Sequence, residues 1–81
     1  MAIVGALLHA EPKVSQAVQK HLSGFDNVEV HPLESPGQMA LIIESKDINQ
    51  AHHLITNSIG TTEGVLTVYP VYAHLDDIEN S

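Results

Sequence analysis

The chain of 81 residues contains no cysteine and no arginine, and its only aromatic residues besides histidine are one phenylalanine and two tyrosines. The lack of cysteine excludes disulfide bonds and thiolate metal sites. Three lysines stand against ten Asp and Glu residues, so the formal net charge is -7. A nucleic-acid-binding protein needs a basic surface to displace counterions from phosphates. So acidic a chain lacks such a surface, which excludes the class of nucleic-acid-binding proteins. The same charge should attract a basic partner and raise the encounter rate.

Long hydrophobic runs are also missing. No apolar segment approaches the roughly 18 residues of a membrane span. The N-terminal sequence "MAIVGALLHAEP" lacks the basic region that precedes the apolar run of a secretory signal. We therefore expect a cytoplasmic protein that does not bind membranes. Its length is that of one small domain, in which only about 60% of the unfolded surface becomes buried and the core is thin.

No motif for catalysis or metal binding stands out. None of the histidine pairs has the spacing, with an intervening glutamate, that a zinc hydrolase uses. His52 and His53 are adjacent and point to different sides of a helix. No serine lies in a strained nucleophile motif, and the five glycines form no phosphate-binding loop. We expect no catalytic residues, no metal site and no cofactor.

The first half of the chain predicts a strand, a helix and a second strand. Residues 2–10 are apolar nearly throughout, which indicates a central strand. After Pro12, apolar residues repeat at helical spacing, which predicts a helix, and Gly24 predicts its C-terminal end. Residues 28–33 alternate between apolar and polar. Pro32 makes this strand an edge, because proline cannot donate to a ladder.

The second half repeats the pattern of strand, helix and strand. Residues 39–44 predict a second central strand. Asp47 predicts the cap of a helix whose apolar residues repeat at helical spacing, and Gly60 ends it. Residues 65–73 predict the last strand, which Pro70 marks as an edge.

This order predicts an α+β fold of the ferredoxin-like, split βαβ type (βαββαβ). Two right-handed crossovers joined by a hairpin give a four-stranded antiparallel sheet with two helices on one face. We expect residues 1–74 to form this single domain and residues 75–81 to form an acidic, mobile tail.

Alternation along each strand assigns side chains to the two faces of the sheet. On the side of the helices we expect Val4, Ala6, Leu8, Val28, Val30, Met39, Leu41, Ile43, Leu66 and Val68. On the uncovered side or at its edge we expect Ile3, Gly5, Leu7, His9, Glu29, His31, Ala40, Ile42, Glu44, Thr67, Tyr69 and Val71. Tyr69 is then the one aromatic residue on the uncovered face.

An uncovered apolar patch rimmed by acids usually marks an interaction site. The last strand, within "EGVLTVYPVYAHLDD", also carries apolar residues on both of its faces. A partner peptide, the chain's own tail or a second copy could cover the patch, and a slip of one residue in register would exchange the two faces.

Some known classes of protein with this fold are excluded. An RNA-recognition domain needs stacked aromatic and basic residues, a copper chaperone needs cysteines, and an acylphosphatase needs an arginine.

Three segments together resemble the NapD family. They are "EGVLTVYPVYAH" at 63–74, "VEVHPLESPGQMALIIE" at 28–44 and "LLHAEPK" at 7–13, in the same order and spacing. The resemblance extends over residues 2–74. One departure lies at Ala73, where the family more often places a histidine; here His74 follows one position later.

The resemblance implies a cytoplasmic chaperone without enzymatic activity. Members bind the twin-arginine signal peptide of the periplasmic nitrate reductase precursor, largely as a helix, and delay export until the molybdenum cofactor is inserted. The precursor, not the chaperone, carries that cofactor. On the uncovered face, the apolar part of the peptide would lie over Ile3, Leu7, Ile42 and Val71, and its arginines would meet Glu44 and Glu29. We expect a monomer or weak dimer. The alternative is a homodimeric or small-molecule-binding regulatory module of the same fold.

Overall fold

The computed structural model describes residues 2–75 and places two helices against one four-stranded sheet. The elements in chain order are β1 (Ala2–Ala10), a 3-10 turn η1 (Pro12–Val14), α1 (Ser15–Ser23), β2 (Val28–Pro32), β3 (Gln38–Ser45), α2 (Ile48–Leu54), a π-helical turn η2 (Ile55–Ile59) and β4 (Val65–Leu75). This order confirms the predicted βαββαβ sequence of elements.

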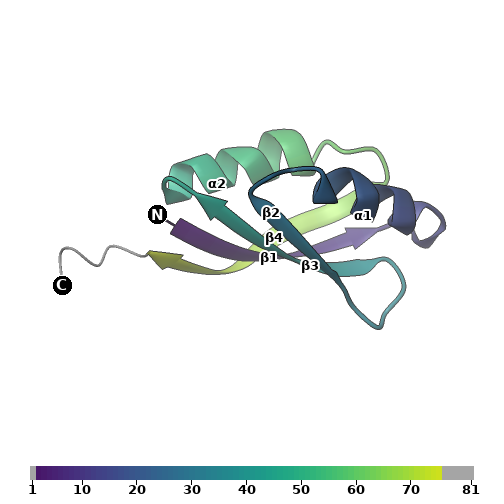
Figure 1. Cartoon of the computed structure of the whole chain (residues 1–81). Helices are drawn as coiled ribbons and strands as arrows, with labels where there is room; N and C mark the ends of the chain where they lie inside the picture. Colours follow the sequence, from purple (N-terminus) through teal and green to yellow (C-terminus); the bar gives the residue numbers. More distant parts are fainter. Residues whose placement is uncertain (1, 76–81) are drawn as a thin grey trace.

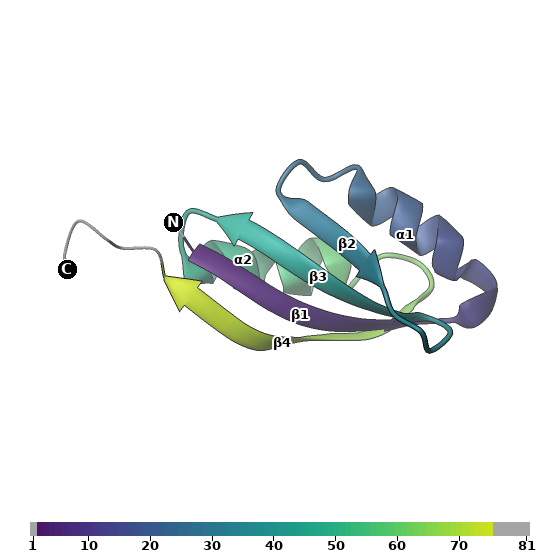
Figure 2. The ribbon, with the colours of Figure 1, turned by 60° about the horizontal axis from the view of Figure 1, so that its bottom comes forward.

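The sheet is antiparallel, with the strand order β2-β3-β1-β4. β1 and β3 are therefore the central strands, as the apolar runs predicted. Both helices lie on the same side of the sheet (Figure 1). Figure 2 turns the other side toward the viewer, with α2 behind the strands and no described helix in front of them. The α+β, ferredoxin-like fold is confirmed.

The core lies between the sheet and the two helices. Strand residues at alternate positions point into it, and the helices contribute one apolar stripe each. Fully or nearly fully buried there are Val4, Ala6, Leu8, Ala10, Val18, Leu22, Val28, Met39, Leu41, Ile43, Ala51, Ile55 and Ile59. Except for Ala10, which was not assigned to a face, the buried positions of β1 and β3 in this list are those that alternation assigned to the helix side.

The second helix begins and ends where its sequence predicts. Asp47 has extended backbone angles, and its Oδ1 accepts a hydrogen bond of 2.8 Å from the Gln50 amide. This is the geometry of a helix N-cap. The Ser45 hydroxyl donates to the Asp47 carbonyl at 2.6 Å and fixes the approach from β3. At the far end, the Gly60 amide donates to the Ile55 carbonyl at 2.7 Å, which closes the π-helical turn.

The hairpin between β2 and β3 rests against the end of β1. Gly37 has a φ of +81°, a conformation that residues with a Cβ rarely adopt. Its carbonyl accepts a 2.7 Å hydrogen bond from the Ala10 amide. Glycine here therefore serves both the turn and the close contact with β1.

The last strand departs from simple alternation at two places. Its register against β1 shifts between Gly5 and Ala6 and again between His9 and Ala10. Each shift leaves one residue of β4, Val71 and Leu66, outside the pairing. β-bulges of this kind change which face the following side chains occupy.

Two sequence-based assignments are wrong for this reason. Leu66 was expected beneath the helices, but 61% of its surface is exposed, and Val65 packs against the core instead. Tyr72 was not expected on the uncovered face, but the bulge at Val71 sets it opposite Gly5, which lies on that face.

The domain boundary expected at residue 74 falls within the last strand, which extends to Leu75. The expected acidic tail falls largely on residues 76–81, which lie outside the described residues. The division into residues 1–74 and 75–81 therefore stays a prediction.

Candidate functional site

The side of the sheet away from the helices is the candidate site, and we call it the open face. Strand pairing sets its side chains in rows across β2, β3, β1 and β4. Its members are Ile3, Gly5, Leu7, His9, Glu29, His31, Gln38, Ala40, Ile42, Glu44, Thr67, Tyr69, Tyr72 and His74. The pairing assigns every predicted site residue to this face except Val71, which the bulge leaves without a partner on β1. Gln38, Tyr72 and His74 were not predicted to lie there.

The middle of the open face is apolar. Gly5 pairs with Ile42, and Leu7 pairs with Ala40 on the neighbouring central strand. Ile3, Leu7 and Ile42 are each partly exposed, although they belong to central strands. Because central strands are hydrogen-bonded on both sides, this apolar surface can be covered only from above, by side chains of another segment or molecule.

Two tyrosines border the apolar centre along β4. Tyr69 lies opposite Leu7 and Tyr72 lies opposite Gly5. About half of each residue's surface is exposed, 49% for Tyr69 and 51% for Tyr72. The odd separation of these residues would normally put them on opposite faces, and the bulge at Val71 brings them to the same one. A proline at position 70 is the sequence signal that could have indicated this, because proline within a strand occurs mainly at edges and bulges.

Carboxylates form the opposite border of the open face. Glu29 on β2 pairs with Ile42, Glu44 on β3 pairs with Ile3, and both side chains are exposed. With Asp26 they line an open recess of about 260 Å³, whose other lining residues are Asn27, Val28 and Ile42. The lysines lie elsewhere, in η1, in α1 and after β3 (Lys13, Lys20 and Lys46). The recess is therefore acidic, and a cation from outside the chain could enter it.

The backbone of Glu44 is held firmly in place. Its amide donates to the Asn27 carbonyl at 2.9 Å, and its carbonyl accepts from Asn27 Nδ2 at 2.8 Å. Asn27 thus binds both polar backbone groups of Glu44 from the turn before β2. The carboxylate extends from a fixed position on a central strand, which favours selective pairing with a charged partner.

Histidines lie on the same face. His31 Nε2 lies 3.1 Å from Glu29 Oε1, within hydrogen-bond distance. His9 pairs with Gln38 and Thr67 across its two neighbouring strands, and His74 lies opposite Ile3. All three histidines are exposed.

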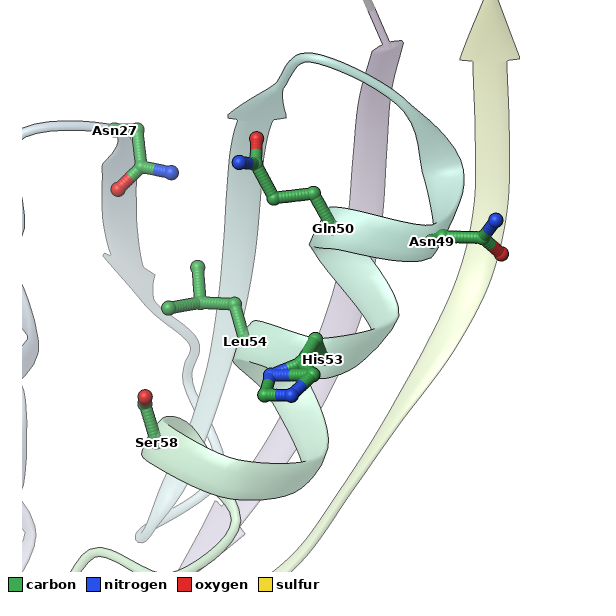
Figure 3. Close-up of a pocket in the computed structure, with 6 residues that line it drawn as sticks. All are labelled: Asn27, Asn49, Gln50, His53, Leu54 and Ser58. Atoms are coloured by element: carbon green, nitrogen blue, oxygen red, sulfur yellow. The ribbon is translucent and has the colours of Figure 1, made fainter.

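A larger concavity of about 630 Å³ lies on the helix side and has a different character. Figure 3 shows Gln50, Leu54 and Ser58 along one side of α2 and η2, turned toward Asn27. Its polar groups already have partners in part: Gln50 Oε1 accepts from the Lys46 amide at 2.9 Å, and Asn27 binds Glu44. Among the described residues, no carboxylate lines this groove. It therefore has no acidic group to pair with a basic partner, unlike the open face.

Neither concavity contains a recognisable catalytic arrangement of side chains. Within residues 2–75, no three His, Cys, Asp or Glu residues are close enough together to hold a metal ion. No described helix has the length and apolar composition needed to cross a bilayer. What the open face does offer is a broad apolar surface beside an acidic border, which suits recognition of a segment with both basic and apolar parts.

Solved structures with the same arrangement support the fold. The protein TTHA0845 from Thermus thermophilus matches with a TM-score of 0.81 and 20% identity, over 93% of this chain and 94% of that one. The solution structure of NapD, the Escherichia coli Tat proofreading chaperone, matches with a TM-score of 0.77 and 23% identity, over 94% and 80%. The hypothetical protein PHS023 from Pyrococcus horikoshii matches with a TM-score of 0.80 and 12% identity, over 93% and 90%. No curated protein matches the chain.

Fold and site together define a ferredoxin-like domain that presents an uncovered apolar sheet with an acidic border. The sequence model of the family described as NapD protein matches residues 1–77. The chain therefore belongs to the NapD family, as its sequence segments indicated.

Proposed function

We propose that the chain is a cytoplasmic chaperone, without enzymatic activity, that binds a twin-arginine signal peptide on its open face. The client we propose is the catalytic subunit of periplasmic nitrate reductase. Binding holds the precursor back from export until its molybdenum cofactor is inserted. Membership of the NapD family and the fold shared with the E. coli Tat proofreading chaperone support this proposal.

The observation that carries the proposal is the match between the open face and the chemistry of such a signal. A twin-arginine signal joins a basic segment to an apolar one. The open face joins an acidic border at Glu29 and Glu44 to an apolar centre at Ile3, Leu7 and Ile42. Arginine pairs well with carboxylates, because its planar fork donates two parallel hydrogen bonds. The net charge of -7 adds a long-range attraction.

The size of the face suits one helix. Four strands span about 14 Å between the outermost strand axes, at about 4.8 Å per step. A helix with its side chains is about 10–12 Å wide. A helical signal peptide could therefore lie along the strands with its apolar stripe on the centre and its arginines toward β2 and β3. Recognition of an amphipathic helix by an apolar surface is a common mode of peptide binding.

Self-association is a second way to cover the open face. Two copies would each bring a charge of -7 and the same acidic border to the interface, and this repulsion opposes a tight dimer. We therefore propose a monomer or weak dimer. Size-exclusion chromatography with light scattering tests this point: a dimer that persists on dilution would favour the structural alternative.

Calorimetry with synthetic peptides tests the proposed function. The ligand would be the twin-arginine signal peptide of a nitrate reductase precursor, and the matched control would be the same peptide with both arginines replaced by glutamine. We expect saturable binding of the first peptide and much weaker binding of the second. Equal affinity for the two, or no binding of the first, would contradict the proposal.

A further inference from the structure

The ring of Tyr72 lies flat on Gly5. A Cβ placed on Gly5 would lie 2.7 Å from Cδ2 and 2.8 Å from Cζ of the tyrosine ring, and closer still to Cε2 between them. Such similar distances to three successive ring carbons mean that the Cβ position lies above the face of the ring. If it lay in the ring plane beyond the edge, Cδ2 and Cζ would be clearly farther from it than Cε2. The absence of a side chain at Gly5 is what allows the ring to settle on β1.

This packing leaves the opposite ring face directed away from the sheet. Tyr72 is 51% exposed as a residue even though it rests on a buried glycine of a central strand. A tyrosine held in this way has lost most of its freedom before any ligand arrives. Its free face is a flat surface of negative quadrupole, on which a cation can stack.

Carboxylates lie near enough to the ring to complete a site for a cation. Ile42 separates Gly5 from Glu29 in one row across the sheet. Glu44 pairs with Ile3, two residues from Gly5 along β1. Diagonal neighbours of this kind are about 7–8 Å apart, a distance that the glutamate side chain can reduce.

We propose that Tyr72, lying on Gly5, is a specificity-determining residue that stacks one guanidinium group of the signal peptide, with Glu44 as the carboxylate partner of the same group. This inference rests on the proposed function and assigns the arginine preference to a particular surface. A guanidinium is planar and weakly hydrated, so it stacks on an aromatic face, whereas an ammonium is a compact and strongly hydrated charge. The site therefore distinguishes arginine from lysine.

The test is calorimetry with the full chain and two peptides, a twin-arginine signal peptide and the same peptide with twin lysines. Replacing Tyr72→Leu should weaken binding of the arginine peptide about two- to fivefold. It should change binding of the lysine peptide less than about twofold. Tyr72→Phe keeps the stacking face and should bind like the original chain. Tyr69→Leu is the matched control, and it should affect both peptides equally.

Gly5→Ala tests the same site without removing the ring. The new methyl group would occupy the place of the tyrosine ring and lift it from β1. We expect a selective loss for the arginine peptide in this variant too, with circular dichroism reporting that the domain is folded. Equal losses for both peptides in Tyr72→Leu and Gly5→Ala, or no loss in either, would overturn the inference while leaving the proposed function intact. Failure of the unmodified chain to bind either peptide would overturn both.

Discussion

The imidazole of His31 and the carboxylate of Glu29 lie within hydrogen-bond distance on the open face, with 3.1 Å between Nε2 and Oε1. They are two residues apart on the edge strand β2, so both side chains lie on the same side of the sheet. Glu29 is also one of the carboxylates proposed to meet an arginine of the peptide. A bound arginine would therefore have to share this carboxylate with His31 or displace the imidazole from it.

Salt should weaken binding without abolishing it. The acidic border and the net charge of -7 face a basic peptide, and their attraction is screened over about 10 Å at 0.1 M salt and about 3 Å at 1 M. The apolar contacts over Ile3, Leu7 and Ile42 are not screened. The affinity should therefore fall with ionic strength to a plateau. An affinity independent of salt would remove the electrostatic part of the proposal.

Glu44→Gln should reduce affinity more than removal of the acidic residues after β4. Asn27 holds the backbone of Glu44 through two hydrogen bonds, so the carboxylate is presented from a fixed position. The comparison is between Glu44→Gln and a chain that ends at residue 75, both measured by calorimetry. A greater loss in the shortened chain would place the arginine contacts on the last residues rather than on Glu44.

The N-cap of α2 gives a test of the fold that is independent of the peptide. Asp47 accepts the Gln50 amide hydrogen at 2.8 Å, and Asp47→Ala should lower the free energy of unfolding by about 1 kcal/mol. Asp47→Asn keeps an accepting oxygen and should lose much less. Urea denaturation measures both. Equal losses would show that the charge at this position, rather than the hydrogen bond, stabilises the helix.

The sequence predicts the two central strands better than the edge strand β4. Alternation in β1 and β3 separates buried Leu8, Leu41 and Ile43 from partly exposed Leu7 and Ile42, since these strands are paired without interruption to each other. The rule that works there depends on an unbroken ladder.

β4 is different because two of its residues are outside the ladder. Alternation misplaces Leu66 because it is itself one of these unpaired residues. It misplaces Tyr72 because all side chains after the unpaired Val71 move to the other face. Pro70 indicates an irregularity in this strand, but only the partner strand shows where the ladder shifts. One of the two tyrosines of the candidate site was missed for this reason.

The most direct test of the open face uses two neighbouring residues of β1. Leu8 is 1% exposed beneath the helices, whereas Leu7 is partly exposed opposite Ala40 and Tyr69. An aspartate at position 7 would face water in the free protein but would be buried without a partner in the complex, at a cost of several kcal/mol. Leu8→Asp is the matched control and should unfold the domain.

Calorimetric titration of Leu7→Asp with the twin-arginine signal peptide is therefore the decisive measurement, with circular dichroism recorded on the same sample. We expect a folded domain with no measurable binding, because about 1.4 kcal/mol already lowers affinity tenfold. A folded Leu7→Asp chain that binds the peptide as tightly as the original would contradict binding on the open face.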